Sequence, residues 1–244
     1  MLPKFSLIAP AIREHNYKKI YKHLRNDNDA KFEMVFVGDK PPRKKISSKF
    51  RYIYTEVGLP QCVEIAAREA RGEYLICITD DIDFSPHFLD KIDSYLIRLH
   101  MDKMLIGNRF KSFGEFQNES MFFDVNIDNS PVISFAPVYK KNLWHKFGGI
   151  DRRFKFGFHY IDLMMRFYEA GHNLFIIPDS WCNEFKDKKI SNGKFKKNKH
   201  YGRKFCNRLW VEDGEVVENR LLPVESFDDK DILTKDQFVE YKYF

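Results

Sequence analysis

The sequence contains no long hydrophobic run, and this absence argues against a transmembrane helix. No stretch of about 18 apolar residues, the length that a transmembrane helix needs, occurs among the 244 residues. The first ten residues, MLPKFSLIAP, also lack the apolar core and the small-residue cleavage site of a secretory signal. We therefore expect a cytoplasmic protein that is soluble or associates with a membrane only peripherally.

Cysteine is scarce, and the few cysteines form no recognised pattern. Cys62, Cys77, Cys182 and Cys206 lie far apart and include no C-x-x-C pair. This spacing excludes a zinc ribbon and a disulfide framework, and it predicts reduced, mostly buried thiols. Internal repeats and low-complexity segments are absent as well, which excludes a repeat array.

Aromatic residues, in contrast, are plentiful. The chain has 24 Phe and 12 Tyr, as expected of a globular protein and not of a disordered, charge-rich chain. A chain of this length can bury a substantial core, and we expect one large α/β domain followed by a tail.

Positive charge is concentrated in one segment. The formal net charge is +6, and residues 186–208 contain ten Lys and Arg against a single acid, Asp187. Residues 212–240 reverse this balance, with ten acids against Arg220, Lys230 and Lys235. The basic character is therefore local, and the acidic tail is expected either to be solvated or to dock on the rest of the chain.

Strand and helix patterns alternate over the first hundred residues. Apolar runs predict strands at 5–10, 32–39, 51–54 and 73–78, and helical spacing predicts helices around 17–24, over 61–70 and from Pro86 through Leu99. The later pattern is less regular and suggests strands at 104–107, 132–135 and 174–178, a long loop over 112–130 and a helix over 160–170. This order predicts a mostly parallel sheet with helices on both faces.

Three carboxylates follow the predicted strand 73–78 within four positions, in the stretch LICITDDIDFSP. Asp80, Asp81 and Asp83 would repel one another unless a positive group lay among them, and a divalent cation is the leading candidate. Ligands of parallel α/β sheets bind beyond the carboxyl ends of strands, where this cluster is expected. The alternative is a polar turn that caps the helix opening at Pro86.

Four blocks of the sequence, spanning about residues 4 to 180, together resemble GT-A glycosyltransferases, in particular the family 2 enzymes that use nucleotide sugars. The acidic run Thr79–Asp83 stands in the place of the DxD motif of that family. Of the other three blocks, one is the first strand with Pro10 and the helix after it, and another is Gly58-Leu59 with residues 70–74. The last block is residues 148–154, followed by Asp162-Leu163, Arg166, Ala170-Gly171 and Pro178.

The resemblance implies a GT-A, Rossmann-like domain over residues 1–180. Its nucleotide-binding half would cover about 1–100 and its acceptor-binding half about 101–180. Residues 181–244 would form a basic loop and an irregular acidic extension packed on the same domain. The implied activity is metal-dependent transfer of a sugar, with inversion, from a UDP or GDP sugar to a hydroxyl of a glycan or lipid-linked saccharide.

The implied cofactor is Mn²⁺ or Mg²⁺, because a hard cation that prefers carboxylate oxygens can neutralise the diphosphate of the donor. Asp81 and Asp83 share a face of an extended segment and could converge on one ion. The usual frame of the family instead aligns Thr79-Asp80-Asp81. Asp81 belongs to both frames and is the predicted ligand, followed by Asp83, while Asp80 is expected at the ribose or a metal-bound water.

The family binds its nucleotide after the first two strands. Pro10 and Arg13 follow the first strand, and Asp39 follows the second, where an acid contacts the base or ribose; Asp39 can equally be a turn residue after Gly38. The basic segment is expected to close over the donor, hinged at Gly193 and Gly202. Within it, Lys197 and Arg203 would contact the diphosphate, and His200 would join the metal.

The basic segment 186–208 has other interpretations. It can be an ordinary solvated surface, a patch for anionic lipid head groups that gives peripheral membrane contact, or a nucleic-acid footprint. Interleaved aromatic residues keep the last of these open, but we do not expect nucleic acid as a partner.

An inverting enzyme needs a general base for the acceptor hydroxyl. The family carries a Glu-Asp pair where this chain has His159-Tyr160. His159 is the first candidate base, because an imidazole titrates near neutral pH. Asp162 and Asp151 are the alternatives, and a histidine among aromatic residues can also be purely structural.

Two rival functions remain open. A sugar-phosphate nucleotidyltransferase would share the sheet and an acidic metal site, but the segment Ala9–Arg13 lacks the glycine-rich loop of that class. A non-catalytic module that binds glycans or polyanions would explain the missing Glu-Asp pair.

Overall fold

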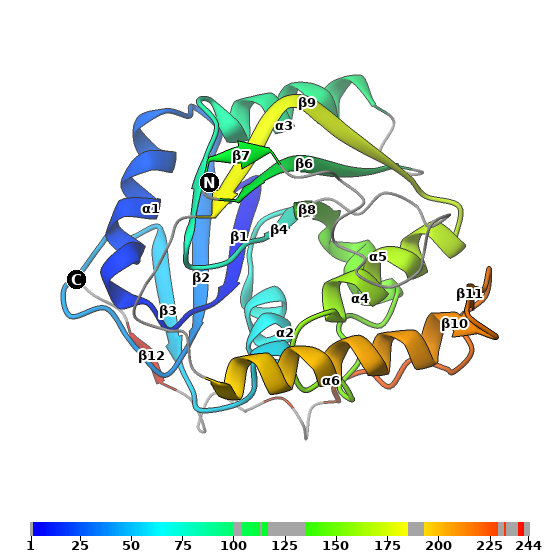
Figure 1. The fold of residues 1–244 in the computed structure, drawn as a ribbon. Coiled ribbons are helices and arrows are strands. Elements are labelled where there is room, and N and C mark those ends of the chain that lie inside the picture. The colour runs from blue at the N-terminus through cyan, green and yellow to red at the C-terminus, as the bar shows by residue number, and fades with distance from the viewer. Residues whose placement is uncertain are drawn as a thin grey trace.

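The computed structural model describes residues 2–99, 104–112, 114–116, 135–184, 193–228, 232 and 239–241. In the first half of the chain, strands and helices alternate as predicted (Figure 1). These elements are β1 (Phe5–Pro10), α1 (Glu14–Asn26), β2 (Phe32–Gly38), β3 (Phe50–Tyr54), α2 (Leu59–Glu69), β4 (Tyr74–Cys77), β5 (Ile82–Phe84) and α3 (Phe88–Arg98).

The second half is less regular, as the sequence also indicated. Its elements are β6 (Met104–Ser112), β7 (Glu115–Phe116), β8 (Phe135–Lys140), α4 (Lys141–Lys146), α5 (His159–Glu169), β9 (Asn173–Glu184), α6 (Gly193–Trp210), β10 (Val211–Glu212), β11 (Glu215–Val216) and β12 (Val239–Tyr241). Most of the predicted loop 112–130 and of the strand 132–135 lies outside the described residues.

One sheet joins nearly all of the strands, in the order β12-β3-β2-β1-β4-β8-β6-β9-β5, with β7 beside β6. Strands β3, β2, β1 and β4 are parallel to one another, whereas β8 lies antiparallel between β4 and β6. The predicted α/β fold is therefore confirmed, with a parallel first half and antiparallel pairings in the second half.

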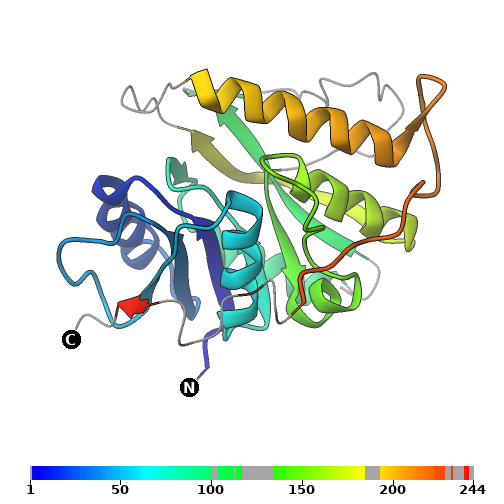
Figure 2. The same ribbon diagram turned by 90° about the horizontal axis from the view of Figure 1, so that it is seen from below.

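The alternation of side chains along each strand divides the core between the two faces of the sheet. Phe5, Leu7 and Ala9 of β1 point to one face, and Ile8 points to the other. Helices α1 and α3 cover the first face, and α2, α4, α5 and α6 cover the second (Figure 2). In α1, the buried stripe is the one that the helical spacing of Tyr17, Ile20, Tyr21 and Leu24 predicts.

The sequence-based prediction is wrong chiefly for the basic segment 186–208. Its described part is not a loop but the 18-residue helix α6, which packs on the second face through an apolar stripe of Phe205, Cys206, Leu209 and Trp210. Gly202, a predicted hinge, lies inside this helix and packs closely, since a Cβ there would lie 2.0 Å from the carbonyl oxygen of Phe156. The predicted helix from Pro86 begins at Phe88, because His87 before it has a left-handed backbone conformation with φ 54°.

No helix in the described part of the chain is both long and apolar enough to cross a membrane. The four cysteines are free thiols, and three of them are buried, as predicted.

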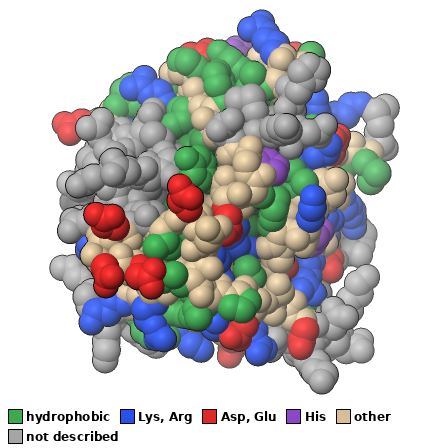
Figure 3. Space-filling view, turned by 90° about the vertical axis from the view of Figure 1, so that its right-hand side faces the viewer, with side chains coloured by type: hydrophobic (Ala, Val, Ile, Leu, Met, Phe, Trp, Pro, Cys, Tyr) green, Lys and Arg blue, Asp and Glu red, His purple; other side chains and the backbone are tan. Residues whose placement is uncertain are grey.

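The described part of the C-terminal segment contacts the second half of the sheet domain. After the hairpin β10–β11, the side chain of Arg220 reaches two fully buried carboxylates, Asp162 at 2.8 Å and Asp151 at 2.6 Å. A single β-bridge also joins Asp151 to Ser226. Acidic side chains gather on the face of the molecule that carries this hairpin, whose exposed acids are Glu212, Asp213 and Glu215 (Figure 3).

We expect Arg220→Gln to lower the free energy of unfolding by about 3 to 5 kcal/mol, because it leaves two buried carboxylates short of a positive partner. Urea unfolding followed by circular dichroism measures the change. Arg208→Gln, on the exposed side of α6, is the matched control and should change stability by no more than about 0.5 kcal/mol. Equal effects of the two substitutions would contradict the docking role of Arg220.

Candidate active site

The carboxyl ends of the parallel strands meet at one edge of the sheet. β1, β2, β3 and β4 end there because they are parallel. β6 and β9 end there too, because β8 is antiparallel to both β4 and β6, and β9 is parallel to β6. Pro10, Arg13, Asp39 and the acidic cluster lie at or soon after these strand ends, so this carboxyl edge is the candidate site.

Asp80 joins the loop after β4 to the loop after β1. Its residue is 1% exposed, and its carboxylate accepts hydrogen bonds from the backbone N–H groups of Ile12 and Arg13, each at 2.6 Å. The guanidinium of Arg13 also pairs with it, and Asn16 donates to the Asp80 carbonyl oxygen at 3.0 Å. Burial raises the pKa of Asp80, while Arg13 and the two backbone N–H groups oppose the rise. Asp80 thus fixes the β1–α1 loop.

The same arginine contacts the second acid of the cluster. Arg13 Nη2 lies 3.1 Å from Oδ2 of Asp81, whose residue is 8% exposed. Asp83 has a different partner, Nδ1 of His23 on α1, at 2.8 Å. The positive group that the three carboxylates require is therefore supplied by the chain itself, chiefly by Arg13.

These contacts leave no ready-made metal site. Asp80 and Asp81 share Arg13, and the part of the chain that the structure describes contains no group of three or more His, Cys, Asp or Glu able to hold a metal ion. An ion at Asp81 would have to displace Arg13. The acids as arranged do not fit the predicted Mn²⁺ or Mg²⁺, and the side chain of the third predicted ligand, His200, lies outside the described residues.

The loops after β1 and β2 are held together by a tyrosine. The hydroxyl of Tyr52 donates to the carbonyl oxygen of Ala11 at 3.0 Å and accepts from the N–H of Lys40 at 2.9 Å. Tyr17 donates to the Lys40 carbonyl oxygen at 3.1 Å, and its pKa is raised by burial and by the neighbouring Tyr52. Pro10 ends β1 beside this bridge, and Asp39 is exposed after β2, open to a ligand.

His159 is the first residue of α5 and follows a strained turn. Gly157 and Phe158 both have positive φ angles, 54° and 57°, and positive φ is unfavourable for a phenylalanine. His159 is 5% exposed, and within the described chain its Nδ1 has no hydrogen-bond partner. Burial lowers the pKa of His159 to about 4, so the imidazole is neutral at physiological pH. A neutral, unpaired imidazole nitrogen can accept a proton.

The two alternative bases are already engaged by arginines. Asp162 accepts from Arg166, from Arg220 and, at 2.9 Å, from the indole N–H of Trp210. Asp151 pairs with Arg153 and Arg220. Burial alone would raise the pKa of Asp151, but the hydrogen bonds from these two arginines lower it below its usual value. Both carboxylates are fully buried, and their oxygens already accept hydrogen bonds from these partners, which hold the fold together.

Residues 148 and 149 are both glycines because the backbone there has positive φ angles and leaves no room for a Cβ on Gly149. Both glycines have positive φ angles, 81° and 61°, and a Cβ on Gly149 would lie 2.4 Å from a carboxylate oxygen of Glu64. Glu64 accepts from the indole N–H of Trp144 and from the N–H of Ile150, both at 3.1 Å. The block therefore fixes the segment that leads to Asp151.

The sequence did not reveal several of these contacts. Tyr52, His23 and Glu64 were not singled out, because each acts through a partner that is distant in sequence. Of the two predicted diphosphate ligands, Arg203 is partly exposed on α6, and the side chain of Lys197 lies outside the described residues.

Solved structures with this fold include TarS of S. aureus, a GT-A-type glycosyltransferase. The crystal structure of S. aureus TarS 1-349 in complex with UDP has a TM-score of 0.56 and 18% identity, and the match covers 74% of this chain and 60% of that chain. For the crystal structure in complex with UDP-GlcNAc, the TM-score is 0.57 and the sequence identity is 16%. That match covers 80% of this chain and 64% of the TarS chain.

This chain thus spans about 60% of the length of the TarS 1-349 structures. No protein-family model matches the sequence, and no curated protein matches it significantly. At this level of identity the likeness concerns the fold, which is that of the GT-A glycosyltransferases.

Proposed function

We propose that the chain is a glycosyltransferase that moves a sugar from a UDP or GDP sugar to a hydroxyl of a glycan or lipid-linked saccharide. The observation that carries the proposal is the loop after β1, which Asp80, Arg13 and Tyr52 fix at the carboxyl edge of the sheet. The TarS complexes with UDP and UDP-GlcNAc, which share the fold, support a nucleotide sugar as the ligand.

In this proposal, the first half of the chain binds the donor. The fixed loop from Pro10 to Arg13 and the exposed carboxylate of Asp39 contact the base and ribose, and Arg13 and Arg203 lie near the diphosphate. The nucleotide-binding half would cover about residues 1–100 and the acceptor-binding half about 101–180, with 181–244 as an extension that carries α6.

The second half supplies the base. The acceptor oxygen attacks the anomeric carbon from the face opposite the diphosphate, the bond from that carbon to the phosphate oxygen breaks, and the acceptor proton passes to Nδ1 of His159. Within the described chain this nitrogen has no hydrogen-bond partner, and its low pKa keeps it unprotonated at physiological pH while making it a weaker base than an ordinary histidine. No step relies on the Mn²⁺ or Mg²⁺ that the resemblance implies, because Arg13 already contacts Asp80 and Asp81.

The rival functions differ in what they would consume and release. A nucleotidyltransferase would make pyrophosphate from a sugar phosphate and a nucleoside triphosphate, whereas the transferase releases a nucleoside diphosphate. A binding module would bind glycan and release neither product. A panel of UDP and GDP sugars with glycan acceptors tests the transferase by release of nucleoside diphosphate. Sugar phosphates with nucleoside triphosphates test the nucleotidyltransferase by release of pyrophosphate, and a binding module gives neither product.

The first prediction concerns the loop that Asp80 fixes. We expect Asp80→Asn to weaken UDP binding by about tenfold or more, because the loop after β1 loses its charged anchor. Isothermal titration calorimetry in EDTA measures the affinity, and circular dichroism checks that the variant is folded. Asp83→Asn is the matched control: its partner is His23, so UDP affinity should stay within about threefold.

A wild-type affinity for Asp80→Asn would contradict this placement of the nucleotide. Repeating the titration with Mn²⁺ tests the metal separately. A gain of about tenfold or more that Asp81→Asn removes would show that a metal displaces Arg13, contrary to the arrangement described above.

The second prediction concerns the base. We expect His159→Gln to lower turnover by about 100-fold or more while UDP affinity is kept, because only the proton acceptor is lost. Release of nucleoside diphosphate in the presence of acceptor measures turnover. His172→Gln is the matched control, since His172 is also buried among aromatic rings and its Nε2 has no partner in the described part of the chain.

The pH profile gives an independent check. Because the pKa of His159 is about 4, the base stays unprotonated until the pH falls to that range, so the rate should not decline near pH 6.5. A rate that falls as the pH drops through the ordinary histidine pKa would contradict this prediction. So would full activity of His159→Gln, and in either case another group would be the general base.

A further inference from the structure

We propose that a cluster at the carboxyl ends of β6 and β9 binds an acidic sugar unit of the acceptor glycan. The inference rests on the proposed function and specifies its acceptor. The cation–aromatic cluster, as we call it, consists of Arg109 and Lys111 of β6, Phe116 of β7 and Trp181 of β9.

The side chains of the cation–aromatic cluster converge. The guanidinium carbon of Arg109 and the ammonium nitrogen of Lys111 lie 3.9 Å and 4.4 Å from the ring centroid of Phe116. The same ammonium nitrogen lies 3.9 Å from the ring centroid of Trp181. The two positive charges are therefore neighbours, no farther apart than the sum of their distances to the centre of one ring.

Neither cation has an acidic partner. In the described part of the chain, neither Arg109 nor Lys111 forms an ion pair. Aromatic rings attract cations but carry no net charge, so both positive charges remain. Glu115 and Glu184, the acids on the adjacent strands, lie opposite Ser112 in the register. Because side chains alternate along a strand, these acids belong to the other face from Lys111.

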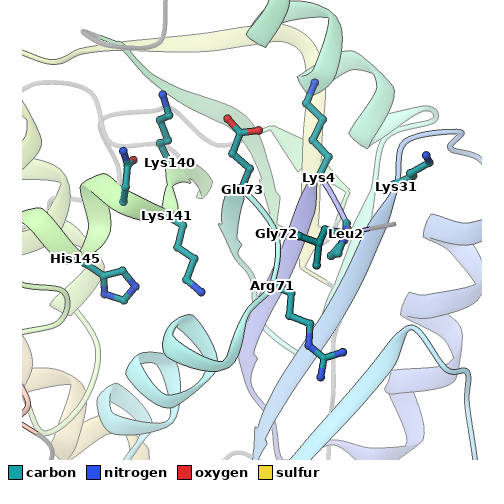
Figure 4. A pocket seen from close by; sticks show the side chains of 11 residues that line it. Leu2, Lys4, Lys31, Arg71, Gly72, Glu73, Lys140, Lys141 and His145 are labelled. Carbon is teal, nitrogen blue, oxygen red and sulfur yellow. The ribbon is translucent and has the colours of Figure 1, made fainter.

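The positive residues at the opposite edge of the sheet do not converge in this way. A hollow at the amino ends of the parallel strands is lined by Lys4, Lys31, Arg71, Lys140, Lys141 and His145. The side chains of these residues point apart (Figure 4), and Lys4 pairs with Asp93. Residues of this hollow therefore serve as controls for positive charge that is not focused on one point.

The cation–aromatic cluster lies at the same edge of the sheet as the candidate donor site, because β6 and β9 both end there. The N–H of Ser85 donates to the carbonyl oxygen of Trp181 at 2.9 Å, and the N–H of Trp181 donates to the Ser85 hydroxyl at 3.3 Å. Ser85 comes four residues after Asp81, which corresponds to about 13 Å of extended chain. This spacing suits an acceptor whose acidic unit lies beside the sugar that reacts.

The turn between β6 and β7 holds Phe116 in position. The side-chain oxygen of Asn183 on β9 accepts from the N–H of Gly114 at 2.8 Å. Gly114 has a φ of 94°, which glycine adopts without strain. Phe116 lies directly opposite Lys111 in the β6–β7 register. The ring is thus beside the cations before a ligand binds, which reduces the entropy lost on binding.

An acidic sugar matches both parts of the cation–aromatic cluster. A carboxylate or phosphate group accepts charge-assisted hydrogen bonds from guanidinium and ammonium groups. Phe116 is 45% exposed and Trp181 is partly exposed, so ring surface is available to the apolar face of a pyranose. A neutral sugar would use the rings alone, and a small anion would use the charges alone.

The test is a titration of the intact chain with glucuronic acid, glucose 6-phosphate and glucose, which share one ring and differ in the charged group. NMR of the indole N–H groups reports binding, because Trp144 and Trp210 are buried and donate to carboxylates, whereas Trp181 is partly exposed. We expect a saturable shift of the Trp181 signal with an acidic sugar, at an affinity about tenfold or more above that for glucose. Sodium acetate at the same ionic strength should give only weak, unsaturable shifts.

The carboxylate and phosphate arms identify the preferred acidic group. Lys111→Gln should weaken binding of the preferred sugar by about fivefold or more and leave the response to glucose unchanged. Arg71→Gln, which removes an exposed cation at the opposite edge, is the matched control and should change neither. Thermal unfolding checks that both variants fold.

Three results would overturn the inference: no saturable response to either acidic sugar, equal responses to glucuronic acid and to glucose or acetate, or an unchanged affinity in Lys111→Gln. A separate titration with UDP distinguishes this failure from failure of the proposed function. UDP binding without acidic-sugar binding would keep the donor site and remove this acceptor subsite. Acidic-sugar binding without UDP binding would keep the subsite and contradict the transferase.

Discussion

The contact between Arg13 and the acids after β4 is the interaction on which the candidate site depends. Three carboxylates in four positions could not remain ionised together at the end of a buried strand without a positive neighbour. The chain supplies that neighbour from the loop after β1, and Asp80 in turn binds the backbone of the same loop. Arg13 therefore offsets part of the negative charge of the cluster, and its contacts with Asp80 join the loop after β1 to the loop after β4.

A second set of ion pairs performs a similar task on the other half of the sheet. Asp151 and Asp162 are fully buried. Arg220 of the C-terminal segment pairs with both, Arg153 also pairs with Asp151, and Arg166 of α5 pairs with Asp162. This use of the two carboxylates leaves His159, whose Nδ1 has no partner among the described residues, as the predicted residue that can still accept a proton. A donor edge and a proton acceptor in the same fold are the minimum that sugar transfer to a hydroxyl requires.

The sequence predicted the first half of the fold well, because each strand and helix there follows a local pattern. The alternation in β1 and the stripe of Tyr17 and Leu24 in α1 are examples. It failed at α6, where lysines hide a narrow apolar stripe that becomes visible only against the second face. It placed Asp80 and Asp81 correctly at a strand end but inferred a metal, because the arginine that pairs with them lies nearly seventy positions earlier in the sequence. Whether a carboxylate meets a guanidinium or an ion depends on tertiary contacts that a local motif does not encode.

A crystal structure of the chain grown with UDP and Mn²⁺ would test the central claim most directly. The account predicts UDP against the loop from Pro10 to Arg13 and beside Asp39, with Arg13 still bound to Asp80 and Asp81 and no anomalous manganese signal between them. A manganese ion coordinated by Asp81 with Arg13 displaced, or UDP bound away from the carboxyl edge, would contradict it.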